Sequence, residues 1–282
     1  MTALPDSGGP RVGAVVALKP VARAKSRLGG LPDPLRRRLA WTMAVDTLTA
    51  LAGGGASILV VSDQPALTSR LARSGVPARV VGESGAVGMN GALARGAQLL
   101  VADGCSTVLA CVGDLPALRP ASVRAVLRAA PEVGRAFLAD ASGTGTTMLL
   151  ARGADLDPRF GGPSAAAHAA SGATALTDTG LGGPIPDARS DVDTEDDLGR
   201  GVDLGLGAAT ARLTDQHGQL GRYAMIMTTG HTDDHDHPLV VTSTGDRVPL
   251  PSDALADDLQ PLRPGQRLHC VLAGGVVLSA WL

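Results

Sequence analysis

Short apolar runs alternate with helical segments through the first half of the chain. The runs that we expect to form buried strands are Val12 to Leu18, Ile58 to Ser62, Ala78 to Val81 and Thr107 to Val112. Helices are predicted over Asp33 to about Ala52, Ala66 to Ser74, Asn90 to about Ala102, and from Pro120 onward. This alternation is typical of a mostly parallel sheet that is covered by helices on both faces. The pattern therefore predicts an α/β fold.

Turn residues support the boundaries of these elements. Asp33-Pro34 supplies a capping residue and a proline at the first helical position, and Gly53-Gly54-Gly55 ends the same helix. Asn90 is expected to cap the third helix.

The pattern changes from Arg135 onward. The elements expected there are two short strands (Arg135 to Ala139 and Thr146 to Ala151) around a glycine-rich turn, a small helix near Ala165 to Ala170, and a helix that opens within Asp191 to Leu198 and fades near Leu213.

Beyond Gln219, β-type runs are separated by turn residues. The runs are Tyr223 to Thr229, Leu239 to Ser243, Arg247 to Leu250, Arg267 to Leu272 and Val276 to Trp281. Their spacing predicts a small barrel, SH3-like or OB-like, of roughly 60 residues. We therefore divide the chain into a main domain over 11–213 and a small β domain over 220–282. Because every candidate site residue precedes Leu198, we expect the barrel to be dispensable for the chemistry.

Composition and charge narrow the range of functions. Hydrophobic residues make up 44% of the chain and aromatic residues only 2%, so the core must consist mainly of Val, Leu, Ala and Ile. A balance of 25 basic against 27 acidic residues argues against a nucleic-acid or anionic-membrane surface. The three cysteines, Cys105, Cys111 and Cys270, have no metal-ligand spacing and are typical of a reducing compartment. Without a leader-type or membrane-length apolar run, we expect a cytoplasmic protein.

Two polar clusters follow strands, at the sheet edge where parallel α/β proteins bind ligands. The segment Lys19 to Arg27 holds four cations, which suit a phosphate-rich ligand, although a solvated basic loop is an equal alternative. It does not have the spacing of a P-loop. Asp114, in Gly113-Asp114-Leu115-Pro116, is expected at the tip of a central strand, where a carboxylate can bind Mg²⁺ or simply form a turn.

A pair of carboxylates precedes the last predicted helix of the main domain. Asp191 and Asp193 lie on one face of the chain if this segment is extended, and one of them would complete a metal site with Asp114. Alternatively, Asp193 or Thr194 caps the helix, and Glu195 to Asp197 favour its positive end.

Two glycine-rich segments offer main-chain N–H groups and hydroxyls without bulk. Gly143 to Thr146 and Phe160 to Ser164 can each cradle a small carboxylate or phosphate, or form an ordinary turn. His168 is isolated, and we expect it to be a structural or a helix-surface residue rather than a general base. The sequence shows no Ser-His-Asp pattern and no zinc spacing in this domain, and phosphoryl transfer needs neither.

Taken together, these segments resemble the phospholactate/phosphoenolpyruvate guanylyltransferase family of coenzyme F420 biosynthesis. The resemblance covers about Val12 to Leu213. Six motifs in order carry it: Lys19 to Leu28, Gly88-Met89-Asn90, Gly113 to Leu118, Ala139 to Leu149, Phe160 to His168 and Asp191 to Leu198. The resemblance implies a GT-A-like (Rossmann-like) nucleotidyltransferase fold. It also implies an enzyme that transfers GMP from GTP to phosphoenolpyruvate or 2-phospho-L-lactate and releases pyrophosphate.

The resemblance further implies roles for single residues. The implied metal ligands for Mg²⁺ are Asp114 and Asp193, with Asp191 as the substitute. The implied nucleotide-binding residues are Lys19, Lys25, Arg27 and Asn90, and the implied residues for the phospho-acid are Thr146, Gly161 and Ser164. Asp114, Lys19 and Lys25 would be the catalytic residues among them.

Some positions depart from the family pattern and keep alternatives open. Gly162-Pro163 and Ala165 are smaller or stiffer than the polar residues expected beside Ser164, so the acceptor stays open among phosphoenolpyruvate, 2-phospho-L-lactate and 3-phosphoglycerate. One alternative is another GT-A-like enzyme, of the molybdenum-cofactor or sugar-phosphate type. A second is a nucleotide-binding regulator without catalysis. The expected partners are GTP and a small phospho-acid, and contacts with the next enzyme of the pathway or with a second copy of the chain stay open.

Overall fold

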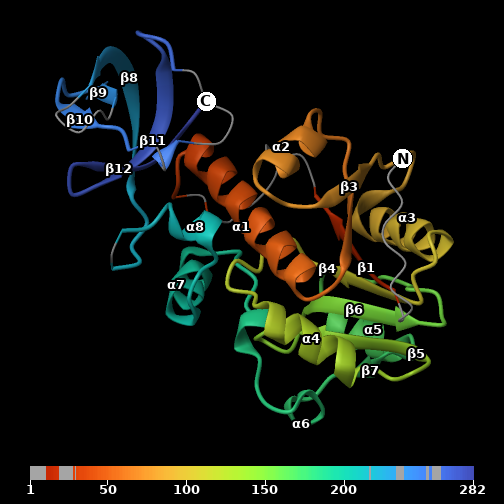
Figure 1. Ribbon diagram of the computed structural model, residues 1–282. Coiled ribbons are helices and arrows are strands. Elements are labelled where there is room, and N and C mark those ends of the chain that lie inside the picture. The colour runs from red at the N-terminus through yellow and green to blue at the C-terminus, as the bar shows by residue number, and fades with distance from the viewer. Residues whose placement is uncertain are drawn as a thin grey trace.

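The large sheet has seven strands in the order β3-β2-β1-β4-β6-β5-β7 (Figure 1). The computed structural model describes residues 11–18, 28, 30–215, 217–232, 238–251, 254–255 and 262–282. The strands are β1 (Val12–Ala17), β2 (Ser57–Val61), β3 (Ala78–Val81), β4 (Thr107–Cys111), β5 (Gly134–Ala139), β6 (Thr146–Arg152) and β7 (Thr174–Ala175). Only β6 runs antiparallel to its neighbours in this sheet, which confirms the mostly parallel α/β prediction.

Helices cover both faces of this sheet. They are α1 (Asp33–Gly53), α2 (Leu67–Arg73), α3 (Gly88–Ala102), α4 (Pro120–Ala129), α5 (Ser164–Ala170), α6 (Asp178–Leu181), α7 (Glu195–Leu204) and α8 (Ala208–Ala211), with a short 3₁₀ turn, η2 (Pro186–Ala188). One apolar cluster joins α1, α2 and α4 to one face, and another joins α3 and α5 to the opposite face. In the described part of the chain, no helix is long and apolar enough to cross a membrane.

The first strand shows how its sequence serves both layers. Ala14 and Val16 are buried on the α1 side, whereas Val15 is buried on the α3 side, as the two-residue period of a strand requires. Gly96 of α3 faces Val15, and a Cβ at this position would overlap the valine side chain. The glycine therefore lets α3 pack closely on the centre of the sheet.

Three helix predictions need correction. The N-cap of the first helix is Pro32, so Asp33 is the first helical residue and does not cap it. The third helix begins at Gly88 after Val87, so Asn90 lies in its first turn and does not cap it. The helix expected to continue to about Leu213 ends at Leu204, because Gly205 takes a positive φ of 86° that stops an L-residue helix. A separate short helix, α8, follows.

The C-terminal strands form a second sheet in the order β10-β9-β8-β11-β12. They are β8 (Arg222–Thr232), β9 (Pro238–Thr242), β10 (Arg247–Pro249), β11 (Arg267–Ala273) and β12 (Val276–Trp281), and every neighbouring pair is antiparallel. The edge strands β10 and β12 also approach each other, so the sheet is curled. All five predicted β runs are confirmed as strands.

The small sheet shares its core with α1. In Figure 1 the N-terminal end of α1 lies beside this sheet, at the end of the helix away from the large sheet. Leu35, Leu39 and Met43 of α1 are buried in the same apolar cluster as Leu268 and Trp281 of the small sheet. The helix therefore has two apolar faces, one for each sheet, and this feature bears on whether the two parts fold separately.

Candidate active site

A cavity of about 650 Å³ opens at the carboxyl ends of β1 and β4. It also takes in the turn between β5 and β6 and the loop that leads into α5. Six of the predicted site residues line it: Asp114, Thr146, Gly161, Ser164, Asp191 and Asp193. Segments that are far apart in the sequence therefore meet in one place, at the edge of the sheet where the α/β pattern predicted a ligand.

The cationic residues Lys19, Lys25 and Arg27 lie outside the described residues. Leu18, which precedes this segment, lines the cavity.

A main-chain hydrogen bond joins the two carboxylate segments. The Val192 N–H donates to the carbonyl oxygen of Asp114 over 3.0 Å, and the Val192 side chain is fully buried in the core. Asp191 and Asp193 flank this buried residue and are half-buried in the wall of the cavity. Both carboxylates line the same cavity, which is the arrangement expected if this segment is extended.

The position of Asp114 is supported from α1. The buried Thr47 hydroxyl accepts a hydrogen bond from the Leu115 main-chain N–H over 3.0 Å and donates to the Met43 carbonyl over 2.8 Å. The turn that carries Asp114 is thus tied to a helix, and a substitution of the carboxylate alone leaves these bonds in place. Cys111, at the end of β4, is buried, and burial raises the pKa of its thiol well above the usual range, so it stays protonated.

The helix that follows the carboxylate pair has a cap of its own. Thr194 is the N-cap of α7, and its hydroxyl accepts a hydrogen bond from the Asp197 N–H over 3.2 Å. Asp197 completes this capping box by accepting from the main-chain N–H groups of Asp193 and Thr194. Of the two alternatives for the cap, the structure therefore shows Thr194, and the carboxylate of Asp193 is not needed for that task.

Burial and the neighbouring carboxylates make the ionisation of Asp191 more costly. Burial, and after it the charges of Asp114, Asp193 and Asp140, together raise the pKa of Asp191 to about 6. Asp140 also lines the cavity, and the sequence analysis missed it. Its position directly after β5 was a usable signal, because Asp114, another carboxylate of the site, also follows a strand.

This donor set fits a hard divalent cation. Every side-chain donor that these aspartates offer is a carboxylate oxygen, which suits Mg²⁺, and a bound cation would relieve the repulsion that raises the Asp191 pKa. Within the described residues, however, no three acidic, histidine or cysteine side chains converge into a complete metal site. Because Mg²⁺ commonly takes one or two carboxylates and completes its shell with waters and substrate phosphates, the residues fit an ion that binds together with substrate.

Hydrogen bonds to main-chain groups hold the segments that carry Thr146, Gly161 and Ser164, the residues predicted to bind the phospho-acid. The Thr144 carbonyl accepts from the Ala165 N–H over 3.0 Å, which ties the glycine-rich turn to the start of α5. Asn90 clasps the main chain of Phe160: its amide oxygen accepts from the Phe160 N–H over 2.8 Å, and its amide nitrogen donates to the Phe160 carbonyl over 3.0 Å. The amide of Asn90 thus holds the loop that carries Gly161, and its contact with a nucleoside stays a prediction.

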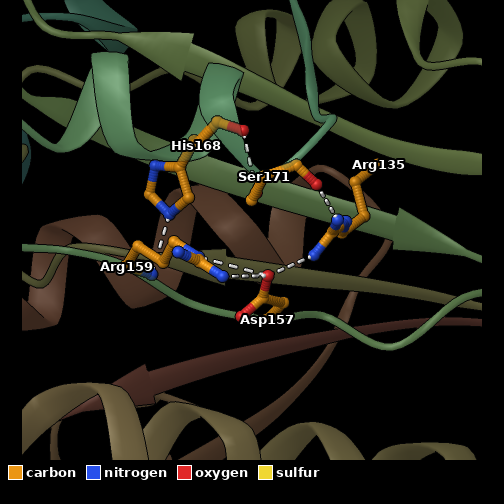
Figure 2. Close-up of polar contacts among 5 residues, drawn as sticks. All are labelled: Arg135, Asp157, Arg159, His168 and Ser171. Carbon is orange, nitrogen blue, oxygen red and sulfur yellow. Dashed lines mark hydrogen bonds and ion pairs between the residues drawn. The ribbon is translucent and has the colours of Figure 1, made fainter.

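Asp157 and two arginines, Arg135 and Arg159, form a charged clamp at the start of this loop. Asp157 accepts from Arg135 over 2.7 Å and from Arg159 over 3.1 Å, and these guanidinium groups lower the pKa of its carboxyl (Figure 2). Arg135 also donates to the Ser171 carbonyl at the end of α5. Next to the clamp lies His168, which is fully buried, so it is not the helix-surface residue that was one of the two alternatives.

The free energy of unfolding should fall as the pH drops below about 6.5, through His168. Burial lowers its pKa in the folded chain, and the Asp157 charge only partly opposes this. The unfolded chain then binds more protons, so the stabilisation is fully present above about pH 6.5 and is lost toward the folded-state pKa. Urea unfolding between about pH 5 and pH 8 measures the effect. A His168→Gln chain is the control, and an equally steep fall in that variant would contradict the assignment.

A family model and several relatives show the family to which this chain belongs. The family model described as "Guanylyl transferase CofC like" matches residues 12–210. A phosphoenolpyruvate guanylyltransferase from Salinispora arenicola is 46% identical over 205 residues, which cover 71% of this chain and 91% of the relative. One from Geodermatophilus obscurus is 43% identical over 207 residues, 71% of this chain and 92% of the relative. Among solved structures, a nucleotidyl transferase from Methanothermobacter matches with 22% identity and a TM-score of 0.48 over 69% of this chain and 97% of its own.

Proposed function

Because the chain belongs to the CofC-like guanylyl transferase family, we propose that it transfers GMP from GTP to phosphoenolpyruvate and releases pyrophosphate, a step of coenzyme F420 biosynthesis. The observation that carries this proposal is the meeting of Asp114 with Asp191 and Asp193 in a cavity that Thr146, Gly161 and Ser164 also line. The residues proposed to bind the metal and those proposed to bind the phospho-acid therefore line one cavity. The names of the relatives favour phosphoenolpyruvate over the other acceptors.

The proposed reaction is a displacement at phosphorus. An oxygen of the phosphoenolpyruvate phosphate attacks the α-phosphorus of GTP, the bond from that phosphorus to the bridging oxygen of the β-phosphate breaks, and pyrophosphate leaves with the electron pair. A phosphate monoester is largely ionised near pH 7, so the nucleophile needs no general base. The Cys111 thiol in the cavity stays protonated and cannot serve as a general base, which is consistent with a nucleophile that needs none.

The chain's own residues then have to position two anions beside a group of carboxylates. Asp114 and Asp193, with Asp191 as the substitute, would hold Mg²⁺, which when bound supplies positive charge at the reacting phosphate groups. We assign the neutralisation of the triphosphate to Lys19, Lys25 and Arg27. Without these cations, the aspartates of the cavity would repel both substrates.

Thr146, Gly161 and Ser164 are proposed to hold the phospho-acid. Gly161 has a φ of 103° and no side chain, so an anionic oxygen can approach its main chain closely. Ser164 opens α5 and is almost completely buried. We also propose a cytoplasmic location and leave a homodimer, or a contact with the next enzyme of the pathway, as further proposals.

A pyrophosphate-release assay tests the proposal. With Mg²⁺ present, GTP and phosphoenolpyruvate should give faster turnover than GTP with 2-phospho-L-lactate or 3-phosphoglycerate, and faster turnover than ATP or CTP with phosphoenolpyruvate. Equal or faster turnover with ATP or CTP would remove the preference for GTP. Faster turnover with 2-phospho-L-lactate would change the acceptor, and no release with any pair would favour a regulator that binds nucleotide without catalysis.

A further inference from the structure

His168 lies at the centre of the acceptor-side network, and the proposed reaction gives it no role. It is fully buried in α5 and contacts both phenylalanines of the chain. Its ring lies edge-on to Phe160 at 5.2 Å between centroids and tilted against Phe137 at 5.9 Å. These contacts hold the ring in one orientation, so its two nitrogens have fixed partners.

The partner of Nε2 determines where the imidazole proton lies. The main-chain nitrogen of Arg159 is 2.9 Å from Nε2, and a main-chain N–H can only donate (Figure 2). Nε2 must therefore accept, and the neutral ring carries its proton on Nδ1. A doubly protonated ring would set an N–H against the Arg159 N–H, so this contact also opposes protonation.

The partner of Nδ1 is the hydroxyl of Thr146, at 2.9 Å. Because Nδ1 carries the proton, the Thr146 oxygen accepts from His168. A threonine hydroxyl has a single proton, which is then directed away from His168. Thr146 is nearly buried and lines the cavity, so a ligand there can receive this hydrogen bond.

We infer that His168 is a positioning residue that fixes the Thr146 hydroxyl as a hydrogen-bond donor to an anionic oxygen of the phospho-acid. Ionised carboxylate and phosphate oxygens only accept, so a hydroxyl with a free rotor would point its proton toward them only part of the time. The inference rests on the proposed function, since it assumes that a phospho-acid occupies this side of the cavity.

Burial lowers the pKa of His168 and keeps its ring neutral, whereas the surrounding charges act in both directions. Arg135 from β5 and Arg159 from the loop face the ring and disfavour its protonation, and burial does so more strongly. Asp157 and the Ser164 carbonyl act in the opposite direction. Asp157 is itself bound by both arginines, which limits its effect on the histidine. The two arginines of the clamp in Figure 2 thereby favour the neutral ring, and the Arg159 N–H sets its tautomer.

Steady-state kinetics on a small set of variants tests the inference. Thr146→Val removes the hydroxyl at nearly constant shape and should raise the KM for phosphoenolpyruvate about tenfold or more, with the KM for GTP unchanged. His168→Gln lacks a donor at the Nδ1 position and should raise the same KM, whereas His168→Asn places an amide N–H there and should restore part of the affinity. In the Thr146→Val chain, adding His168→Gln should cause no further rise, because the two residues act through one hydrogen bond.

Ser171→Ala is the matched control, because the hydroxyl of Ser171, the C-cap residue of α5, bonds to the His168 carbonyl, whereas the ring nitrogens bond to Thr146 and Arg159. Its KM for phosphoenolpyruvate should match the wild type. Nitrogen NMR of the wild-type imidazole adds a readout that needs no variant and no activity. It should show protonated Nδ1 and unprotonated Nε2 near pH 7.

Two results would overturn the inference. One is an Nε2–H tautomer in the wild-type spectrum. The other is an independent, additive rise in KM when His168→Gln is combined with Thr146→Val. Failure of the proposed function looks different, because the wild-type chain would then release no pyrophosphate from GTP with any of the phospho-acids, whatever the tautomer.

Discussion

Asp114→Asn should lower the kcat of pyrophosphate release by at least ~10²-fold while leaving the fold intact. The change is isosteric and removes only the charge. The Asp114 carbonyl would still accept from the Val192 N–H, and Leu115 would still bond to Thr47. A loss of this size corresponds to roughly 3 kcal/mol of transition-state stabilisation, as expected when a ligand of a catalytic metal is removed.

Asp193→Asn should cost a similar factor in kcat. A role as helix cap would predict a different outcome, because asparagine caps as well as aspartate and activity would be kept. Since Thr194 and Asp197 already form the capping box of α7, Asp193→Asn should not change the stability of this helix. The Asp114→Asn, Asp193→Asn double variant should be scarcely slower than either single variant, because both residues would serve one metal.

Asp196→Asn is the control for both substitutions. Asp196 is exposed in the first turn of α7, three residues from Asp193. The kcat of the Asp196→Asn chain should match that of the wild type. Near-wild-type turnover in Asp193→Asn would transfer the second-ligand role to Asp191. Near-wild-type turnover in Asp114→Asn would remove the metal site from the proposal.

Ending the chain at Leu213 should remove most of the free energy of unfolding. The sequence alone suggested that the barrel is dispensable, but Leu35, Leu39 and Met43 of α1 are buried in a core that they share with it. Exposing each of these side chains costs about 1.5–3 kcal/mol. Their sum is comparable with the whole stability of an ordinary domain, about 5–15 kcal/mol.

The truncation should also disturb the proposed metal site. Val192, between the two carboxylates of the proposed metal site, belongs to the same shared cluster. Loosening that cluster should therefore misplace Asp191 and Asp193 and lower the kcat of any chain that stays folded. Thermal and urea unfolding, followed by the pyrophosphate assay, measure both effects.

Two full-length variants calibrate the truncation. Leu39→Ala removes one buried contact and should cost about 2–5 kcal/mol, whereas Val87→Ala, at a side chain that is 90% exposed, should cost almost nothing. A truncated chain that unfolds like the full chain and keeps its kcat would contradict the shared core. It would instead support the division into independent domains at 11–213 and 220–282, which we keep as a proposal.

All the strands except β7, most of the helices and the positions of the candidate carboxylates were predictable from the sequence, because these depend on local patterns. A buried strand needs a short apolar run wherever it lies, and the period of two places Asp191 and Asp193 on one face as soon as Val192 is buried. The family motifs, spread in order over the first 213 residues, were also visible without coordinates.

What each polar side chain bonds to was decided only by the tertiary structure. Asn90 meets Phe160, 70 residues away, and Asp140 joins the carboxylates from a different strand end. His168 accepts a hydrogen bond from the Arg159 main chain and bonds through its other ring nitrogen to Thr146. The Arg159 N–H thereby sets the tautomer. The second apolar face of α1 likewise gained its partner only when the small sheet packed on it. Hydrogen bonds act over about 3 Å, so a residue's role depends on which distant segment the folded chain brings within that range.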